Sequence, residues 1–544
     1  MSDNSSQRSA WHWFLPAALP SIAVFFWPSF YSPFFGAKTT LLLIVGAIAV
    51  FASLSKNGGT IFPEKILQWA AIFCIAAFIL STFFAHNWTE CWHVLALFAA
   101  AAIFFAALMR QKISVQSLLW AVAISAIAVA IVAIIGHYGY DLPRFFMGTA
   151  AAGRMRTAST LGNPLFTASF LACAVWAVIA IPIRVIWRAL LAVIVLAGMA
   201  STSERTAVFA FVAGAIVISF LGRNALGRGT RTRTTVLIAI FLLVSTAKYS
   251  ANPRSFSTTM EGRVFLWETS LHHVKFLGSG PGSFYRVYNA NLREPGSTIP
   301  PNKFHFINYE TDAHNMFVQT TVEEGVLGLL AMLAFFAAWF RVAWHSRTTL
   351  AGQCAIAAVS AFLAAGLSDD PLSRPEGIAL LAVLLAVPVL IRDNSAIFTL
   401  KSSRLGLRSS SPIFVPIISL LLLLAAGLTA FTNYALHQGE QAGDRGDWAQ
   451  AERWDRAILK FDPAERNARY NLVRALAQEG KYEASFAESE KALHWVNEAE
   501  LHIIRIRILP MLGRTQQAQQ ELIQAQKEFP WSEELQEEAV PGIH

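Results

Sequence analysis

His314 and two arginines are the residues whose types and positions best suit chemistry. His314 lies in Ala313-His314-Asn315, where a long polar segment meets the next apolar run. A neutral imidazole at that place can accept the proton of a hydroxyl nucleophile near neutral pH. Arg205 begins an apolar run and Arg263 lies in the polar segment, and a guanidinium group binds phosphate oxygens through paired hydrogen bonds. These residue types suit a reaction between a hydroxyl group and an anionic phosphate compound.

Other readings of the histidines and cysteines stay open at this point. A lone histidine is more often structural than catalytic, and His305 is a nearby competitor of His314. We interpret His272 and His273 as solvent-facing members of an amphipathic helix. The cysteines stand alone in or beside apolar runs and form no CxxC pair, so they indicate neither a zinc site nor a disulfide framework. They are Cys74, Cys91, Cys173 and Cys354. We predict no metal and no cofactor for the site.

The elements that must position these residues are membrane helices. Of the 544 residues, 55% are hydrophobic and only 14% are charged, and the mean hydropathy is +0.45. Soluble proteins average about 25% charged residues. No basic stripe with interleaved aromatic residues occurs in a polar segment, so we expect no nucleic acid partner. The composition predicts an all-α, polytopic transmembrane helical bundle.

Hydropathy predicts about 12 to 13 membrane spans, because apolar runs near the length that crosses a bilayer recur along the chain. The run after the short polar start is interpreted as a retained first span. The predicted spans are approximately Trp11–Tyr31, Thr39–Leu54, Ile66–Ala85, Trp92–Leu108, Val115–Ile135, Pro164–Ile181, Ala189–Ser201, Thr206–Leu221, Thr235–Ala247, Met316–Trp344, Ala355–Gly366, Gly377–Ile391 and Ile413–Ala430.

Lysines and arginines in the short loops predict an amino terminus on the cytoplasmic side. Arg110 and Lys112 fall in one inward loop, and Arg184 and Arg188 fall in another. The outward loop 85–91 has neither lysine nor arginine. Since cytoplasmic loops carry the excess of positive charge, this distribution sets the orientation of the bundle.

Several arginines break this rule. Arg154 and Arg156 lie on an outward loop before Asn163, and Arg205 and Arg263 also fall on the outward side. Anionic phosphate on the outer face would explain them. The alternative is that a loop arginine reaches the lipid headgroups.

The polar segments divide the chain into four predicted parts. Residues 1–247 and 315–433 are predicted to form transmembrane helices, and 248–314 a large periplasmic loop that carries the active site. Within this loop, Val264, Trp267 and Leu271 share one face of a predicted interfacial helix. The glycines of 278–282 allow tight turns but match no nucleotide-binding fingerprint.

Residues 434–544 are predicted to form a periplasmic helical-repeat domain. Gly446-Asp447-Trp448, Gly480-Lys481-Tyr482 and Gly513-Arg514-Thr515 recur with a period of about 34 residues, which is typical of tetratricopeptide-type helical hairpins. Such a domain serves either as a structural cap or, as we favour, as a docking surface for a protein partner or acceptor.

Several of these segments resemble the O-antigen ligase superfamily, which also contains O-antigen polymerases and bacterial O-oligosaccharyltransferases. The resemblance covers about Trp11 to Ile391 and leaves out the carboxy-terminal repeats. The segments that carry it are Ser203-Glu204-Arg205, Gly262-Arg263 with Trp267, Gly278-Ser279-Gly280-Pro281-Gly282, and Ala313-His314-Asn315 with Glu324-Gly325.

The resemblance implies metal-independent, inverting transfer of a glycan from undecaprenyl diphosphate at the periplasmic face of a bacterial inner membrane, among membrane lipids. It implies catalytic roles for His314, Arg205 and Arg263. It also suggests Asp369 or Asp370 as an acidic site position. Substrate-binding roles are expected for Arg154, Arg156, Asn163, Asn315, Glu324 and Asp369.

The acceptor and the class of function leave alternatives. Lipid A core is the acceptor in the leading hypothesis, which makes the protein a ligase. A polymerase would use a second lipid-linked glycan, and an O-oligosaccharyltransferase would use a protein hydroxyl. A lipid-linked glycan transporter or scaffold is the alternative from another class. The first nine predicted spans contain no aspartate or glutamate, which argues against proton-coupled transport.

Overall fold

The computed structural model describes residues 10–53, 61, 64–148, 157–221, 256–294, 299–307, 310–395 and 414–538. Every regular element in these ranges is a helix, so the predicted all-α class is confirmed. The predicted span Thr235–Ala247 and the candidates Arg154 and Arg156 lie outside the described residues.

Seven of the described helices are long and apolar enough to cross a membrane, which confirms a polytopic membrane protein. They are α2 (Phe35–Ser53), α3 (Lys65–Thr82), α4 (Trp88–Arg110), α5 (Val115–His137), α14 (Gly325–Ala343), α16 (Pro375–Ser395) and α17 (Phe414–Asp444). The shorter helices that pack with them are α1 (Trp11–Val24), α7 (Pro164–Ala180), α8 (Val185–Ser201), α9 (Arg205–Leu221) and α15 (Leu350–Ala365). Single-turn elements are α6 (Leu142–Phe146), η1 (Ser159–Leu161), η3 (Trp344–Ser346), η4 (Pro371–Ser373) and η5 (Pro510–Leu512).

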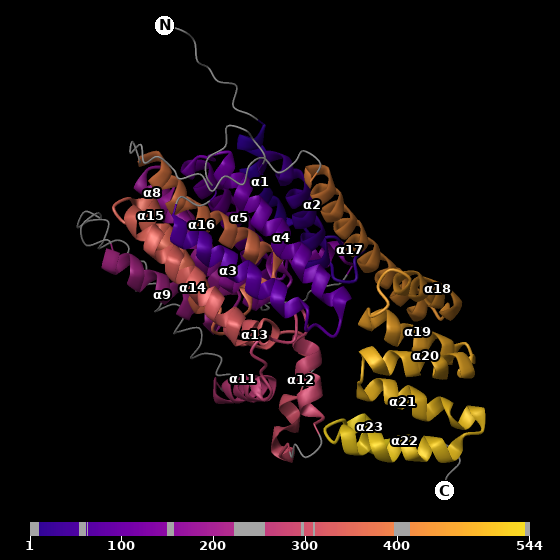
Figure 1. Cartoon of the computed structure of the whole chain (residues 1–544). Helices are drawn as coiled ribbons and strands as arrows, with labels where there is room; N and C mark the ends of the chain where they lie inside the picture. Colours follow the sequence, from indigo (N-terminus) through magenta and orange to yellow (C-terminus); the bar gives the residue numbers. More distant parts are fainter. Residues whose placement is uncertain are drawn as a thin grey trace.

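The helices pack around α16, which is the most enclosed of the candidate spans (Figure 1). In the apolar part of α16, 89% of the residues are buried, whereas only 28% of the residues are buried in the apolar part of α3, at the edge of the bundle. Small residues allow close helix contacts, since a Cβ on Gly46 would lie 2.6 Å from the Ala100 Cβ. The segment that leads into α16 therefore enters the middle of the molecule.

The predicted span Met316–Trp344 is wrong in one respect, because two helices replace it. The first is α13 (Met316–Glu323). The second is α14, which begins at Gly325 after a break in the helix. Gly325 has a φ of +78°, and a Cβ there would lie 2.3 Å from the Phe276 carbonyl oxygen. Only glycine fits this left-handed, crowded position. The glycine-rich segment after Phe276 thus packs against the break.

The long polar segment contains α11 (Phe256–Leu271), α12 (Phe284–Leu292) and η2 (Pro301–Phe306). The predicted amphipathic helix is α11, but its buried face differs from the expected one. Phe265 and Leu266 are buried, whereas Val264 and Leu271 are exposed. The buried pair packs against α12 and η2, which the helical spacing alone did not reveal.

Past the membrane helices, α17 continues into a stack of short helices that lies on the same side of the bundle as α11 and α12 (Figure 1). We call residues 445–538 the C-terminal stack. Gly446, Gly480 and Gly513 have φ values of +75°, +74° and +73°, and a helix starts two residues after each. The helices are α18 (Trp448–Leu459), α19 (Arg466–Gln478), α20 (Tyr482–Trp495), α21 (Ala499–Ile508), α22 (Thr515–Glu528) and α23 (Glu533–Glu537). Their identity as tetratricopeptide repeats stays a prediction.

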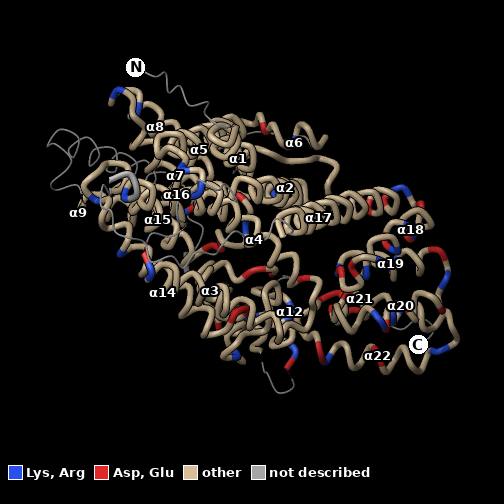
Figure 2. Tube along the Cα trace, turned by 45° about the horizontal axis from the view of Figure 1, so that its top comes forward, with Lys and Arg blue, Asp and Glu red and all other residues tan. Residues whose placement is uncertain are grey.

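Charged residues are sparse along the membrane helices and gather at the helix ends and over the C-terminal stack (Figure 2).

Candidate active site

His314 is held between two acidic side chains just before α13. Its Nε2 lies 3.2 Å from Glu310 Oε2, and its Nδ1 lies 3.1 Å from Asp312 Oδ1. Only the contact with Glu310 has hydrogen-bond geometry. The His314 backbone N–H also donates to Asp312 Oδ1 at 3.0 Å, and its φ of +46° is left-handed. Such a backbone costs a residue other than glycine about 1–3 kcal/mol and is common at functional sites.

These carboxylates set the charge of the imidazole. Burial by itself lowers the pKa of His314, but the hydrogen bond to Glu310 and the charge of Asp312 outweigh burial and raise it. Burial alone would raise the pKa of Asp312, and the charges of His314 and Arg374 outweigh burial and lower it. The pair of Asp312 and His314 is therefore predisposed to be ionised.

Arg374 holds the other side of Asp312. Its Nη2 donates to Asp312 Oδ2 at 2.8 Å, and its guanidinium carbon lies 3.8 Å from the centre of the Phe166 ring. A guanidinium group over an aromatic face is stabilised by the ring quadrupole. Asp312 thus contacts an imidazole and a guanidinium group that come from segments far apart in the sequence.

Residues 366–374, which connect α15 to α16, contact the other parts of the site. The Met316 N–H donates to the carbonyl oxygens of Gly366 and Asp369, at 2.8 and 3.0 Å. Asn315 Nδ2 donates to the Leu367 carbonyl oxygen at 3.1 Å. Because these bonds join the start of α13 to this segment, His314 is fixed relative to Arg374.

Arg263 reaches the same region from α11. Trp267 lies one turn further along this helix and donates from Nε1 to the Ala313 carbonyl oxygen at 2.8 Å. Residues four apart share a helix face, so Arg263 faces the segment that carries His314. Burial lowers the pKa of Arg263, and the carboxylate of Asp369 is the largest opposing influence. A guanidinium group stays charged under these conditions.

Arg205 approaches from α9. It follows Ser203, whose φ of +58° makes a left-handed turn between α8 and α9. The next residue, Thr206, is hydrogen-bonded through its Oγ1 to the Ser368 Oγ at 3.1 Å. Arg205 therefore begins its helix beside the segment that carries Asp369. The structure brings the surroundings of all three predicted catalytic residues together around residues 366–374.

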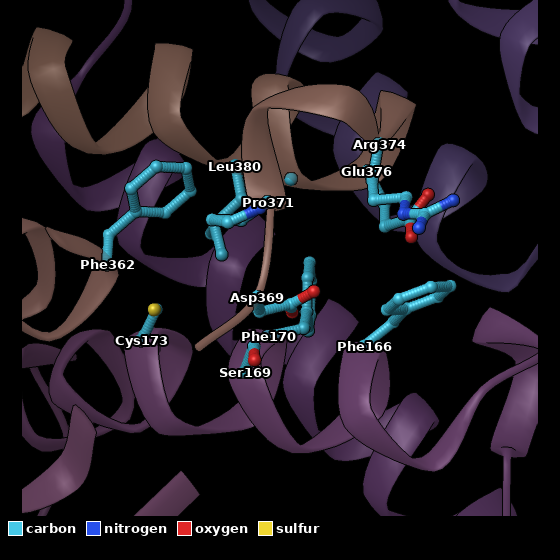
Figure 3. Close-up of a pocket in the computed structure, with 11 residues that line it drawn as sticks. Phe166, Ser169, Phe170, Cys173, Phe362, Asp369, Pro371, Arg374, Glu376 and Leu380 are labelled. Carbon is cyan, nitrogen blue, oxygen red and sulfur yellow. The ribbon is translucent and has the colours of Figure 1, made fainter. Parts of the chain in front are cut away.

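A pocket beside Arg374 is lined by Asp369, Glu376 and aromatic rings (Figure 3). Burial raises the pKa of Asp369 and raises that of Asp370 to about 8. Asp370 is therefore mainly protonated at pH 7, which reduces the negative charge beside Arg374.

The predicted substrate-binding residues have clear structural surroundings. Asn163 and Asn315 are N-caps, whose side chains accept the N–H of Leu165 at 2.8 Å and of Phe317 at 2.9 Å. Glu324 is buried at the break before α14. Their roles toward a substrate stay predictions.

Sequence reasoning missed Asp312, Glu310 and Arg374. Arg374 lies in a short loop on the predicted outward side, so it breaks the positive-inside rule as Arg205 does. That signal could have found it. The two acids have no comparable signal, because acidic residues in a polar loop are common.

A chain of buried polar contacts links the site to α12. Gln319 accepts the Ala313 N–H through Oε1 at 2.7 Å and donates from Nε2 to Glu323 Oε1 at 2.7 Å. The same Glu323 oxygen accepts the Phe284 N–H at 3.2 Å, at the first residue of α12. A movement of α12 would therefore displace the residues that lie beside His314.

The C-terminal stack holds α12 from the other side. Arg293 Nη1 lies 2.7 Å from Glu528 Oε1, and Arg286 Nη1 donates to the Trp495 carbonyl oxygen at 3.2 Å. The Tyr285 hydroxyl donates to the Glu498 carboxylate. Trp531 of the stack also packs against the apolar cluster of α11 and α12. The stack is thus docked on the helices that position the site.

Residues 145–333 match the family model described as O-antigen ligase. None of the curated proteins matches the chain. The matched region contains Arg205, Arg263 and His314 and ends before Arg374.

We predict that reversing one charge in the Arg293–Glu528 pair loosens α12. Arg293→Glu or Glu528→Arg places like charges at a 2.7 Å contact, and the double swap restores attraction. Each single variant should speed amide hydrogen exchange in α12 a few-fold, which corresponds to a coupling of about 1 kcal/mol.

The matched control is the exposed pair Arg514–Glu483 inside the stack. Reversing it should leave exchange in α12 unchanged. A double swap that exchanges as fast as the single variants would contradict a direct contribution of this pair.

Proposed function

We propose, from the premise that residues 145–333 place this chain in the O-antigen ligase superfamily, that it transfers a glycan from undecaprenyl diphosphate to an acceptor hydroxyl. The family match supports a membrane glycosyltransferase of the ligase and polymerase type. The observation that carries the finer proposal is the approach of Arg263, Arg374 and the His314 imidazole to Asp312.

The donor's diphosphate is the group that these cations would hold. As the bond between the anomeric carbon and the phosphate oxygen breaks, negative charge develops on that oxygen. Arg205 and Arg263 can bind the departing diphosphate through paired hydrogen bonds and stabilise that charge. Water is scarce at the membrane edge, so these charge interactions are stronger there than in bulk solvent.

His314 would act on the acceptor. Its hydroxyl oxygen attacks the anomeric carbon from the side opposite the diphosphate, so the configuration there inverts. The hydroxyl proton passes to the imidazole, or the imidazolium orients the hydroxyl while the proton leaves to the departing phosphate. Glu310 and Asp312 stabilise the imidazolium in either case.

We propose that the reaction takes place on the periplasmic face of a bacterial inner membrane. The distribution of lysines and arginines in the short loops supports this orientation. A reporter fused after Lys248 should be active outside the cytoplasm, and cytosolic activity of that fusion would overturn the proposal.

Lipid A core is the acceptor that we propose first. A deletion strain separates the alternatives. Loss of a ligase leaves polymerised glycan on the lipid carrier, and loss of a polymerase leaves single repeats on core. Loss of a protein O-oligosaccharyltransferase removes protein glycans and spares lipopolysaccharide. A transporter would move the lipid-linked glycan across vesicles without transferring it.

Single alanine substitutions test the catalytic assignment. His314→Ala, Arg205→Ala and Arg263→Ala should each lower transfer from a synthetic lipid-linked donor about 10²–10³-fold, because each removes a group that stabilises developing charge. Arg514→Ala, at an exposed position of the stack, is the matched control and should retain transfer. Wild-type transfer by His314→Ala would remove the imidazole from the mechanism.

The pH dependence of transfer tests the state of His314. Glu310→Gln replaces the carboxylate whose hydrogen bond raises the pKa of His314 with a neutral amide, so this pKa should fall. If the neutral imidazole accepts the proton, activity rises with pH through this pKa, and the rising limb moves to lower pH. If the imidazolium is the active form, activity falls through this pKa, and the falling limb moves to lower pH.

Glu268→Gln, on the exposed side of α11, is the control and should leave both limbs in place. Identical profiles for Glu310→Gln and the wild type would show that this hydrogen bond does not set the charge of the imidazole.

A further inference from the structure

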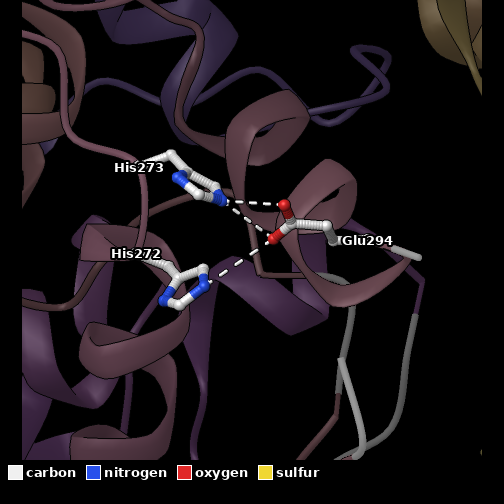
Figure 4. A group of neighbouring side chains, drawn as sticks. All are labelled: His272, His273 and Glu294. Carbon is white, nitrogen blue, oxygen red and sulfur yellow. Dashed lines mark hydrogen bonds and ion pairs between the residues drawn. The ribbon is translucent and has the colours of Figure 1, made fainter. Parts of the chain in front are cut away.

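Two histidines and a glutamate converge where α11 and α12 end. His272 and His273 directly follow α11, and Glu294 lies two residues after α12. His273 Nε2 lies 2.9 Å from both carboxylate oxygens of Glu294, and His272 Nε2 lies 3.7 Å from Oε2 (Figure 4). We propose that these three side chains form a site for a divalent transition metal, represented by Zn²⁺, which joins α11 to α12.

The distances between the ligand atoms suit an ion with tetrahedral coordination. Zinc bonds to imidazole nitrogen and carboxylate oxygen of about 2.0–2.1 Å place neighbouring ligand atoms about 3.4 Å apart. The contacts of 2.9 and 3.7 Å lie on either side of this value, and all three ligand atoms lie within 4.8 Å of one another. Small side-chain rotations would therefore admit the ion, and its fourth position would face solvent.

The chemistry of the ligands favours zinc over magnesium or calcium. Two imidazoles with one carboxylate are typical zinc ligands, whereas magnesium and calcium prefer oxygen alone. The alternative is an ion pair between protonated histidine and Glu294. An ion pair this exposed contributes little to stability, so it gives little reason for both rings to converge on one carboxylate.

The backbone around the site is already held in place. Asn291 Nδ2 donates to the Thr269 carbonyl oxygen at 2.8 Å, which ties the last turns of α11 and α12 together. His272 and His273 are 63% and 58% exposed in their side chains, so an ion reaches them directly from solvent.

The metal site would stabilise the polar segment that contains α11 and α12, and the ion would not contact the reacting atoms. His272 lies nine residues beyond Arg263, which is about 13 Å along a helix. The ion would fix the end of α11 against α12, the helix on which the C-terminal stack docks. This inference does not depend on the transfer reaction, and a metal-independent transfer is compatible with it.

Calorimetric titration of the full-length protein in detergent with Zn²⁺ tests the site, with the purification tag removed and the protein freed of metal by a chelator. One saturable site is expected for the wild type. Glu294→Gln and the double variant His272→Ala/His273→Ala should each weaken binding at least about tenfold. Binding should also weaken in acid, because a protonated imidazole cannot bind a metal.

His305→Ala is the matched control, because it removes another exposed histidine of the same polar segment. It should bind Zn²⁺ like the wild type, which matters in a chain with 13 histidines. In a second measurement, Zn²⁺ should slow amide exchange at the ends of α11 and α12 in the wild type and not in the double variant. Absence of saturable binding, or equal binding by the double variant, would overturn the site and leave an adventitious ion only.

Discussion

A buried carboxylate stays ionised only when it is paired, and Asp312 contacts the guanidinium group of Arg374 and the imidazole of His314. His314 lies two residues away in the chain, whereas Arg374 lies 62 residues away at the entrance to α16. Removing one partner of a buried ion pair is costly because it leaves an uncompensated charge, whereas a complete set is tolerated. Asp312 therefore fixes the distance between the imidazole and the centre of the bundle.

The surrounding elements follow from this pairing. The bonds from Met316 and Asn315 to residues 366–374 keep α13 against the loop before α16, and Trp267 keeps α11 against Ala313. These contacts bring Arg263 and Arg374, from separate parts of the chain, to the acidic side chains beside the imidazole. A site prepared in this way needs little reorganisation when a diphosphate arrives.

The outline of the fold could be predicted from the sequence, because apolar runs of membrane length indicate membrane-spanning helices directly. The break at Gly325 could not, since it depends on the close approach of the Phe276 carbonyl oxygen. The buried face of α11 was also misplaced, because packing on α12 and η2 selects Phe265 and Leu266.

For the site, His314, Arg205 and Arg263 were proposed from their positions and from a family resemblance, and their catalytic roles stay predictions. Asp312, Glu310 and Arg374 were not proposed, because their importance arises from tertiary contacts. The C-terminal stack shows the same limit. Its repeat pattern indicated helices, but only the structure shows that it docks on α12 through Arg293 and Arg286.

Glycan transfer by Asp312→Asn is the most direct test of this account. The substitution keeps the shape of the side chain and removes the charge that pairs with His314 and Arg374. Transfer should fall about 10²-fold while the protein stays folded. The control is Asp455→Asn in the stack, where burial raises the pKa of the aspartate to about 8, so the neutral amide should be tolerated. If Asp312→Asn transfers glycan within about twofold of the wild type, instead of losing about 10²-fold, the central role of this carboxylate is contradicted.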